Sequence, residues 1–106
     1  MTRKLKSYRC AVVAALLASS FSMAFAQDAD QARSWAASCS NCHGTNGVSS
    51  PGRETLAGMP EEMIIKKMQD FKAGRTQATI MHQLAKGYDD AQIAAIAKYF
   101  AKQASQ

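Results

Sequence analysis

Long apolar runs are absent from this chain, and residues that usually bind metals or perform catalysis are scarce. Its longest apolar stretch, residues 10–18, is shorter than the roughly 20 residues that a helix needs to cross a bilayer, which disfavours a membrane anchor. The 106 residues include only three cysteines and two histidines. There is no internal repeat or low-complexity tract, and the length leaves room for one domain.

The first 26 residues have the layout of a secretory signal peptide. A basic segment precedes the apolar stretch, and Ala24 and Ala26 form an A-x-A cleavage site. Cys10 precedes the apolar run, whereas a lipoprotein cysteine would follow it. We therefore predict that residues 1–26 are a cleaved signal peptide and that residues 27–106 form the mature domain. The expected location is the periplasm, in soluble form and without a membrane association after cleavage.

The mature segment carries little net charge. The whole chain has a formal charge of +5, with 13 Lys and Arg against 8 Asp and Glu. Four of those cations lie within the first nine residues, so nine remain against the same eight acids and leave +1. This balance gives no reason to predict a nucleic-acid partner.

Apolar residues recur at helical spacing in four segments, and no stretch alternates convincingly enough to predict a strand. Pro60 suits a first helical position, and Asp89 with Gln92 can form a capping box. Residues 44–58 hold four of the six glycines and are expected to form a loop. The predicted helices cover about residues 30–39, 60–74, 77–86 and 89–100. In the third helix the residues expected to face inward are Ile80, Met81, Leu84 and Ala85.

The sequence Cys39-Ser-Asn-Cys42-His43 is a C-x-x-C-H motif, which is typical of covalent haem attachment. Two thiols three residues apart at the end of a helix lie on the same side, so both can bond to neighbouring haem vinyl groups. His43 then directs its imidazole at the iron. Because a mature chain of this length buries only a modest core, a bound cofactor would also help to stabilise it.

Other uses of the motif are less well supported. A structural zinc site needs four ligands, and the only further histidine or cysteine of the mature chain is His82. A thioredoxin-like motif needs a βαβ context, which a helical chain lacks. A disulfide between Cys39 and Cys42 would close a very small loop and would give His43 no role.

A haem iron held by His43 needs a sixth ligand or keeps an open position. Methionine raises the reduction potential of such an iron, which suits an electron carrier. Met63 and Met68 fit the regular pattern of the second helix and are expected to fill the core. Spacing favours Met81 on the third helix over Met59. Adjacent helical residues point about 100° apart, so Met81 and His82 cannot both face the iron.

Taken together, residues 35–101 resemble the class I cytochromes c, and among them the haem domain of the flavocytochrome c sulfide dehydrogenase cytochrome subunit and its single-domain relatives. The motifs that carry the resemblance are Cys39-Ser-Asn-Cys-His-Gly-Thr-Asn-Gly47, Leu56-Ala-Gly58, Phe71-Lys-Ala-Gly74, Ala78-Thr-Ile-Met81, Leu84-Ala-Lys-Gly-Tyr88 and Ala97-Lys-Tyr-Phe100.

The resemblance implies an all-α class I cytochrome c fold, with four short helices around one covalently bound haem c. It implies that Cys39 and Cys42 attach the haem and that His43 and Met81 bind its iron. It also implies that the carbonyl of Pro51 supports the ring of His43. Two positions depart from the family pattern: His82 replaces a small residue, and Glu54 stands where many relatives have a second proline.

These features predict a periplasmic monohaem cytochrome that transfers single electrons between redox partners and is not itself an enzyme. Candidate partners are a flavoprotein dehydrogenase and a terminal oxidase. A second hypothesis is the electron-accepting haem subunit of a flavoprotein sulfide dehydrogenase or another sulfur-oxidising complex. A third is a haem-based ligand sensor with an open or labile sixth position.

Overall fold

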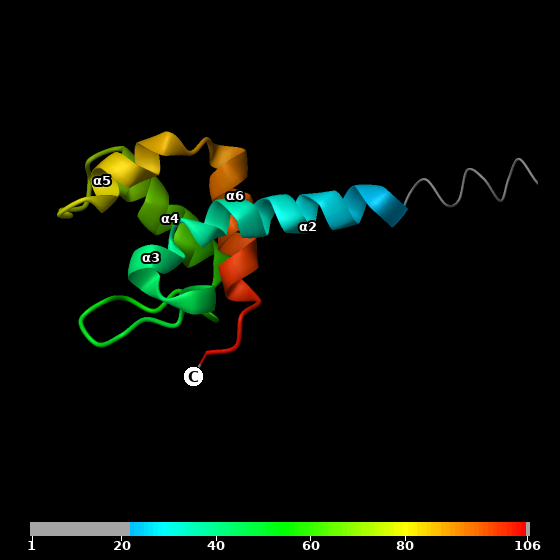
Figure 1. Cartoon of the computed structure of the whole chain (residues 1–106). Helices are drawn as coiled ribbons and strands as arrows, with labels where there is room; N and C mark the ends of the chain where they lie inside the picture. The colour runs from blue at the N-terminus through cyan, green and yellow to red at the C-terminus, as the bar shows by residue number, and fades with distance from the viewer. Residues whose placement is uncertain (1–21, 106) are drawn as a thin grey trace, which may run out of the picture. The chain divides into compact units, whose positions relative to one another are not determined.

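The structure is a computed structural model that describes residues 22–105, with side-chain environments from residue 28 onward. Within this range the secondary structure is helical and contains no strand, which confirms the predicted all-α class (Figure 1). The first 21 residues of the predicted signal peptide lie outside the described range. The elements in chain order are α2 (Ser22–Ala37), α3 (Ser40–His43), η1 (Thr45–Gly47), α4 (Glu61–Lys72), α5 (Met81–Leu84), η2 (Ala85–Gly87) and α6 (Asp90–Ala101).

Helix α2 begins earlier than predicted, at Ser22 instead of near Asp30. Alanine is the strongest helix former, and the alanine-rich residues 23–26 extend the helix without a cap at residue 28 or 30. Cleavage after Ala26 would fall within this helix and stays a prediction. The chain divides into two compact units, Met1–Gln31 and Ala32–Gln106, and the site described below lies in the second. No helix in the described range is both long and apolar enough to cross a membrane.

The core of the second unit forms where α4 packs against α6, two helices that lie side by side in Figure 1. Ile64 and Met68 of α4 are buried one helical turn apart, so they share one face of that helix. Fully burying one such side chain stabilises the fold by about 1.5–3 kcal/mol. The buried cluster comprises Ala36, Ile64, Met68, Ala85, Ile93, Ile96, Ala97 and Phe100.

Both long helices of this unit start and stop where the sequence predicts. The backbone N–H of Gln92 donates to Asp89 Oδ1 at 2.8 Å, and Gln92 Oε1 accepts from the backbone N–H of Asp89 at 2.9 Å. These two bonds form the predicted capping box at the start of α6. Pro60 directly precedes α4, and Gly74, with φ of 72°, follows its end.

The third predicted helix is shorter than expected, because α5 begins only at Met81 and continues into the single turn η2. Residues 77–80 contain the β-branched residues Thr79 and Ile80, whose side chains favour helix less than straight ones do. Ile80 and Leu84, which were expected to face inward, line the cavity described below and are 51% and 47% exposed. Only Ala85 of that set is buried in the core.

The glycine-rich loop between α3 and α4 is closed by backbone hydrogen bonds. The carbonyl of Gly47 accepts from the N–H groups of Leu56 at 2.8 Å and Ala57 at 3.1 Å. The N–H of Gly58 donates to the carbonyl of Phe100 at 3.0 Å, which fastens the loop to α6. Because both ends are held, the residues between them have a defined position next to α3.

Candidate functional site

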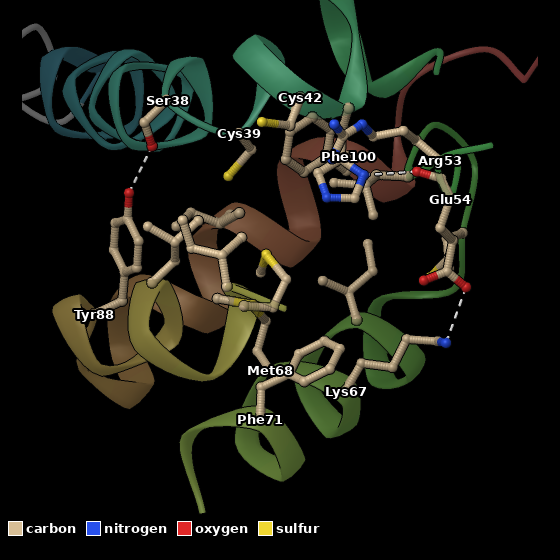
Figure 2. A pocket seen from close by; sticks show the side chains of 18 of the residues that line it. Ser38, Cys39, Cys42, Arg53, Glu54, Lys67, Met68, Phe71, Tyr88 and Phe100 are labelled. Atoms are coloured by element: carbon tan, nitrogen blue, oxygen red, sulfur yellow. Dashed lines mark hydrogen bonds and ion pairs between the residues drawn. The ribbon is translucent and has the colours of Figure 1, made fainter. Parts of the chain in front are cut away.

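A cavity of about 670 Å³ opens beside the core of the second unit (Figure 2). Its volume lies within the roughly 300–1,000 Å³ that is usual for small-molecule and cofactor sites. The lining comes from α3 and the two residues before it, the glycine-rich loop, α4, α5 with η2, and α6. Most of the lining is apolar, including Leu56, Ile64, Phe71, Ile80, Leu84 and Ile96.

A tight backbone turn brings Cys39, Cys42 and His43 to this cavity, and all three line it. The carbonyl of Cys39 accepts from the N–H of Cys42 at 3.2 Å and from the N–H of His43 at 2.9 Å. One helical turn therefore separates the two cysteines, as the motif predicts. Figure 2 shows both cysteines on one side of the cavity, with Met68 and Phe71 of α4 on the opposite side.

The environment of the thiols does not favour a redox dithiol. Cys39 and Cys42 are not joined by a disulfide, and the first is half-buried while the second is exposed. Burial raises the pKa of the Cys39 thiol above its ordinary value, and a hydrogen bond with Ser38 only partly offsets this effect. A reactive redox cysteine needs a lowered pKa instead. Zinc is also unsupported, because no cluster of three or more His, Cys, Asp or Glu suited to a metal occurs among the described residues.

The ring of His43 is oriented by a main-chain oxygen. Its Nδ1 lies 2.7 Å from the carbonyl oxygen of Glu54. A carbonyl can only accept, so Nδ1 must carry the proton and donate it. The neutral ring then keeps its lone pair on Nε2, which is the form that binds a metal ion.

The carbonyl on His43 is that of Glu54, which corrects the prediction for Pro51. The N–H of Arg53 donates to the carbonyl of Ser50 at 3.3 Å, so Pro51 and Gly52 occupy the two central positions of a β-turn. Gly52 has φ of 90°, as a type II turn requires at its third residue. Pro51 is exposed at the tip and does not line the cavity. The Pro-Gly pair was the sequence signal for this turn.

Two side chains fix the segment that supplies this carbonyl. The hydroxyl of Ser49 lies 2.7 Å from the carbonyl oxygen of Glu54 and 2.9 Å from that of His43. The carboxylate of Glu54 pairs with Lys67 Nζ of α4 at 2.9 Å, and Figure 2 shows this ion pair at the edge of the cavity. Sequence reasoning identified neither contact, because no motif marks a serine hydroxyl between two main-chain carbonyls.

Three methionines line the cavity: Met59, Met68 and Met81. Met68 also belongs to the buried core, as expected. Met63 is 47% exposed and does not line the cavity, so the prediction that it fills the core is wrong. His82 does not line the cavity either, and its Nδ1 is buried without a partner among the described residues. The geometry thus keeps Met81 available as a ligand and disfavours His82.

A hydrogen bond closes another part of the cavity wall. The hydroxyls of Ser38 and Tyr88 lie 2.6 Å apart, and Figure 2 shows them across from each other at the wall. Lys72 Nζ donates to the carbonyl of Tyr88 at 2.7 Å, which holds this residue against α4. Segments distant in sequence are therefore tied together around the same space.

The residues present fit a covalently attached haem. Two free thiols three residues apart, a histidine whose tautomer leaves Nε2 available and a methionine thioether all line one apolar cavity. These donors match the His and Met ligation of cytochrome c iron. The apolar lining would also keep water from the iron, which is a further influence on its potential.

Comparison with known proteins also supports a haem-binding chain. Residues 29–104 match the family model described as cytochrome c. The cytochrome subunit of sulfide dehydrogenase from Chlorobaculum tepidum is 43% identical over 63 residues, which is 59% of this chain and 57% of that protein. The thiosulfate dehydrogenase electron acceptor of Thiomonas intermedia is 38% identical over 69 residues, 63% of this chain and 32% of that protein.

A third relative is cytochrome c4 of Pseudomonas aeruginosa, 39% identical over 79 residues, which is 74% of this chain and 39% of that protein. The chain thus spans between about a third and three fifths of the length of these relatives.

Proposed function

The chain belongs to the cytochrome c family and binds haem c covalently, and from this premise we propose that it is an exported, periplasmic monohaem carrier of single electrons. The observation that carries the proposal is that Cys39, Cys42, His43 and Met81 all line one cavity. Cys39 and Cys42 would hold the haem through thioethers, and His43 Nε2 and Met81 Sδ would bind its iron. When bound, haem supplies an iron that alternates between the ferrous and ferric states.

The protein residues orient one iron ligand and give the site an apolar lining. The Glu54 carbonyl fixes the ring of His43, and the apolar lining excludes water. If both His43 and Met81 bind the iron, no coordination position remains for a substrate. Such an arrangement suits an electron carrier and disfavours the ligand-sensor hypothesis.

The charged residues of α4 and of the segment after it form ion pairs within the chain, which supports weak, transient binding of partners. Asp70 binds Lys66 at 2.6 Å and Arg75 at 2.8 Å, and Lys67 pairs with Glu54. These three cations face two acids, so the group carries a net charge of only +1 and its cations are already paired within the chain. Transient redox encounters bury small interfaces, typically below about 1,200 Å² in total.

Export rests on the sequence. The basic, apolar and small-residue order of residues 1–26 supports a cleaved signal peptide and hence the periplasm. N-terminal sequencing of the mature protein tests it, with Gln27 as the expected first residue. A mature protein that begins at Met1 would refute the proposed processing.

A second candidate function is the electron-accepting subunit of a sulfur-oxidising enzyme. Two relatives carry names of that kind, one a sulfide dehydrogenase subunit and the other a thiosulfate dehydrogenase electron acceptor. Purification of the tagged protein from its host distinguishes the two functions. A flavoprotein that stays bound in stoichiometric amount supports the subunit role, whereas elution as a free haem protein supports the independent carrier.

Spectroscopy of variants tests the site itself. A haem stain on a denaturing gel should detect the wild type and Met81→Ala, and Cys42→Ala should impair attachment. Met81→Ala should lose the weak red absorption band of methionine ligation, lower the potential and admit carbon monoxide to the ferrous iron. Met59→Leu is the matched control, since Met59 also lines the cavity, and it should behave like the wild type. Reversed behaviour of these two methionine variants would refute the assignment of Met81.

A further inference from the structure

The hydroxyl of Ser49 occupies a position that the attachment motif does not explain. It lies 2.7 Å from the carbonyl oxygen of Glu54 and 2.9 Å from that of His43. A serine hydroxyl carries one proton, so it can fully satisfy only one of these two acceptors at a time. The shorter distance indicates that the carbonyl of Glu54 receives the larger share.

The carbonyl oxygen of Glu54 therefore serves two donors. His43 Nδ1–H approaches it at 2.7 Å, and the hydroxyl of Ser49 approaches it at the same distance. A carbonyl oxygen has two lone pairs and can accept both bonds. Each donor draws electron density from the same oxygen, so each bond weakens the other.

We propose that Ser49 is a positioning residue that limits the strength of the His43–Glu54 hydrogen bond and thereby raises the reduction potential of the haem iron. The inference rests on the proposed function, in which His43 is an iron ligand. A stronger bond at Nδ1 makes the imidazole more basic and a better donor to the iron. A better donor stabilises the ferric state and lowers the potential.

The competing explanation is that Ser49 only holds the loop in place. In that case its removal would lengthen the His43–Glu54 bond, make the imidazole less basic and raise the potential. The two explanations therefore predict opposite signs. The loop also has anchors that do not involve the Ser49 side chain, namely the bonds from Leu56 N–H to Gly47 O and from Gly58 N–H to Phe100 O. We thus expect it to persist without the hydroxyl.

The experiment measures the potential and one proton resonance in the purified haem protein. The series is the wild type, Ser49→Ala and Ser49→Thr, with Ser50→Ala as control, because the exposed side chain of Ser50 bonds to no described residue. Ser49→Ala should have a lower potential than the wild type. The Nδ1–H resonance of His43 in the ferrous state should move downfield in that variant, as a stronger hydrogen bond requires. Ser49→Thr, which keeps the hydroxyl, and Ser50→Ala should match the wild type.

An unchanged or raised potential in Ser49→Ala, or an unmoved His43 resonance, would overturn the proposal. If Ser49→Ala does not accumulate as haem protein, Ser49→Cys decides the sign, because a thiol is a weaker donor of similar size and should lower the potential in the same direction. A wild type without covalent haem would refute both this inference and the proposed function. A haem-loaded wild type with a Ser49 series of constant potential would refute this inference alone.

Discussion

Gly47 is a position where a single methyl group should disturb both the backbone and the packing of the core. Its φ is 82°, a left-handed conformation that side chains rarely adopt. A Cβ atom there would lie 2.7 Å from Phe100 Cδ1 and 2.9 Å from the backbone nitrogen of Ala57. Phe100 is fully buried, so neither its ring nor the backbone can easily move away.

Two penalties add up in Gly47→Ala. The left-handed backbone costs a residue with a Cβ about 1–2 kcal/mol, and overpacking a buried site costs typically about 1–3 kcal/mol. We expect the free energy of unfolding to fall by about 2–5 kcal/mol, the sum of these two ranges. That is a large part of the roughly 5–15 kcal/mol by which domains are stable.

Alanine substitutions at two other glycines measure the backbone cost and the packing cost separately. Gly52 has φ of 90° but open space around it, so Gly52→Ala should cost only the backbone term, about 1–2 kcal/mol. Gly87 has neither a left-handed backbone nor a close neighbour. Gly87→Ala should leave the stability unchanged or raise it by up to about 1 kcal/mol.

Urea unfolding of the haem protein, followed by far-ultraviolet circular dichroism, measures these differences. The expected order of stability is Gly87→Ala, then Gly52→Ala, then Gly47→Ala. A Gly47→Ala variant as stable as Gly52→Ala would show that the contact with Phe100 carries no cost, and the packing argument would be wrong.

Two charged sites give further predictions. Hydrogen bonds from Lys66 and then Arg75 hold the pKa of Asp70 below its ordinary value. The ionised carboxylate therefore stabilises the fold fully at a pH above the unfolded pKa of about 3.9. This stabilisation is lost as the pH falls through the lower pKa of the folded state. Acid titration of Asp70→Asn should therefore show less loss of stability in that window than the wild type, and parallel curves would contradict the reasoning. Loss of the helix cap in Asp89→Ala should lower the free energy of unfolding by about 0.5–2 kcal/mol, as measured by thermal unfolding. Asp89→Asn should lower it less, because an amide oxygen can still accept from the N–H of Gln92. Equal losses of stability in the two variants would contradict the capping role of Asp89.

The sequence predicted the features that depend on local patterns. The capping box at Asp89, the start of α4 after Pro60 and the C-x-x-C-H turn all arise from residues a few positions apart, and the structure contains each of them. The buried face of α6 follows from the 3.6-residue period in the same way. These are the parts in which neighbouring residues alone set the geometry.

Predictions from the sequence were incomplete or wrong where the position of a residue depends on segments that are distant in the chain. Ile80 and Leu84 have the spacing of a buried stripe, yet they border the cavity, because helical period cannot distinguish a core from a cofactor pocket. Pro51 was expected beneath His43, but the type II turn moves it to the loop tip and brings the carbonyl of Glu54 there instead. A main-chain acceptor has no residue preference, so composition cannot reveal it.

The main-chain carbonyl of Glu54 has a consequence for mutagenesis. Because every amino acid contributes the same oxygen at this point of the backbone, no codon change at position 54 can delete the group that steers the ring of His43. Replacements at this position would instead remove the ion pair with Lys67 and change the cavity wall, which Glu54 also lines. The path of the loop therefore determines the orientation of the ring, and changes in the turn at Ser50–Arg53 would test this directly.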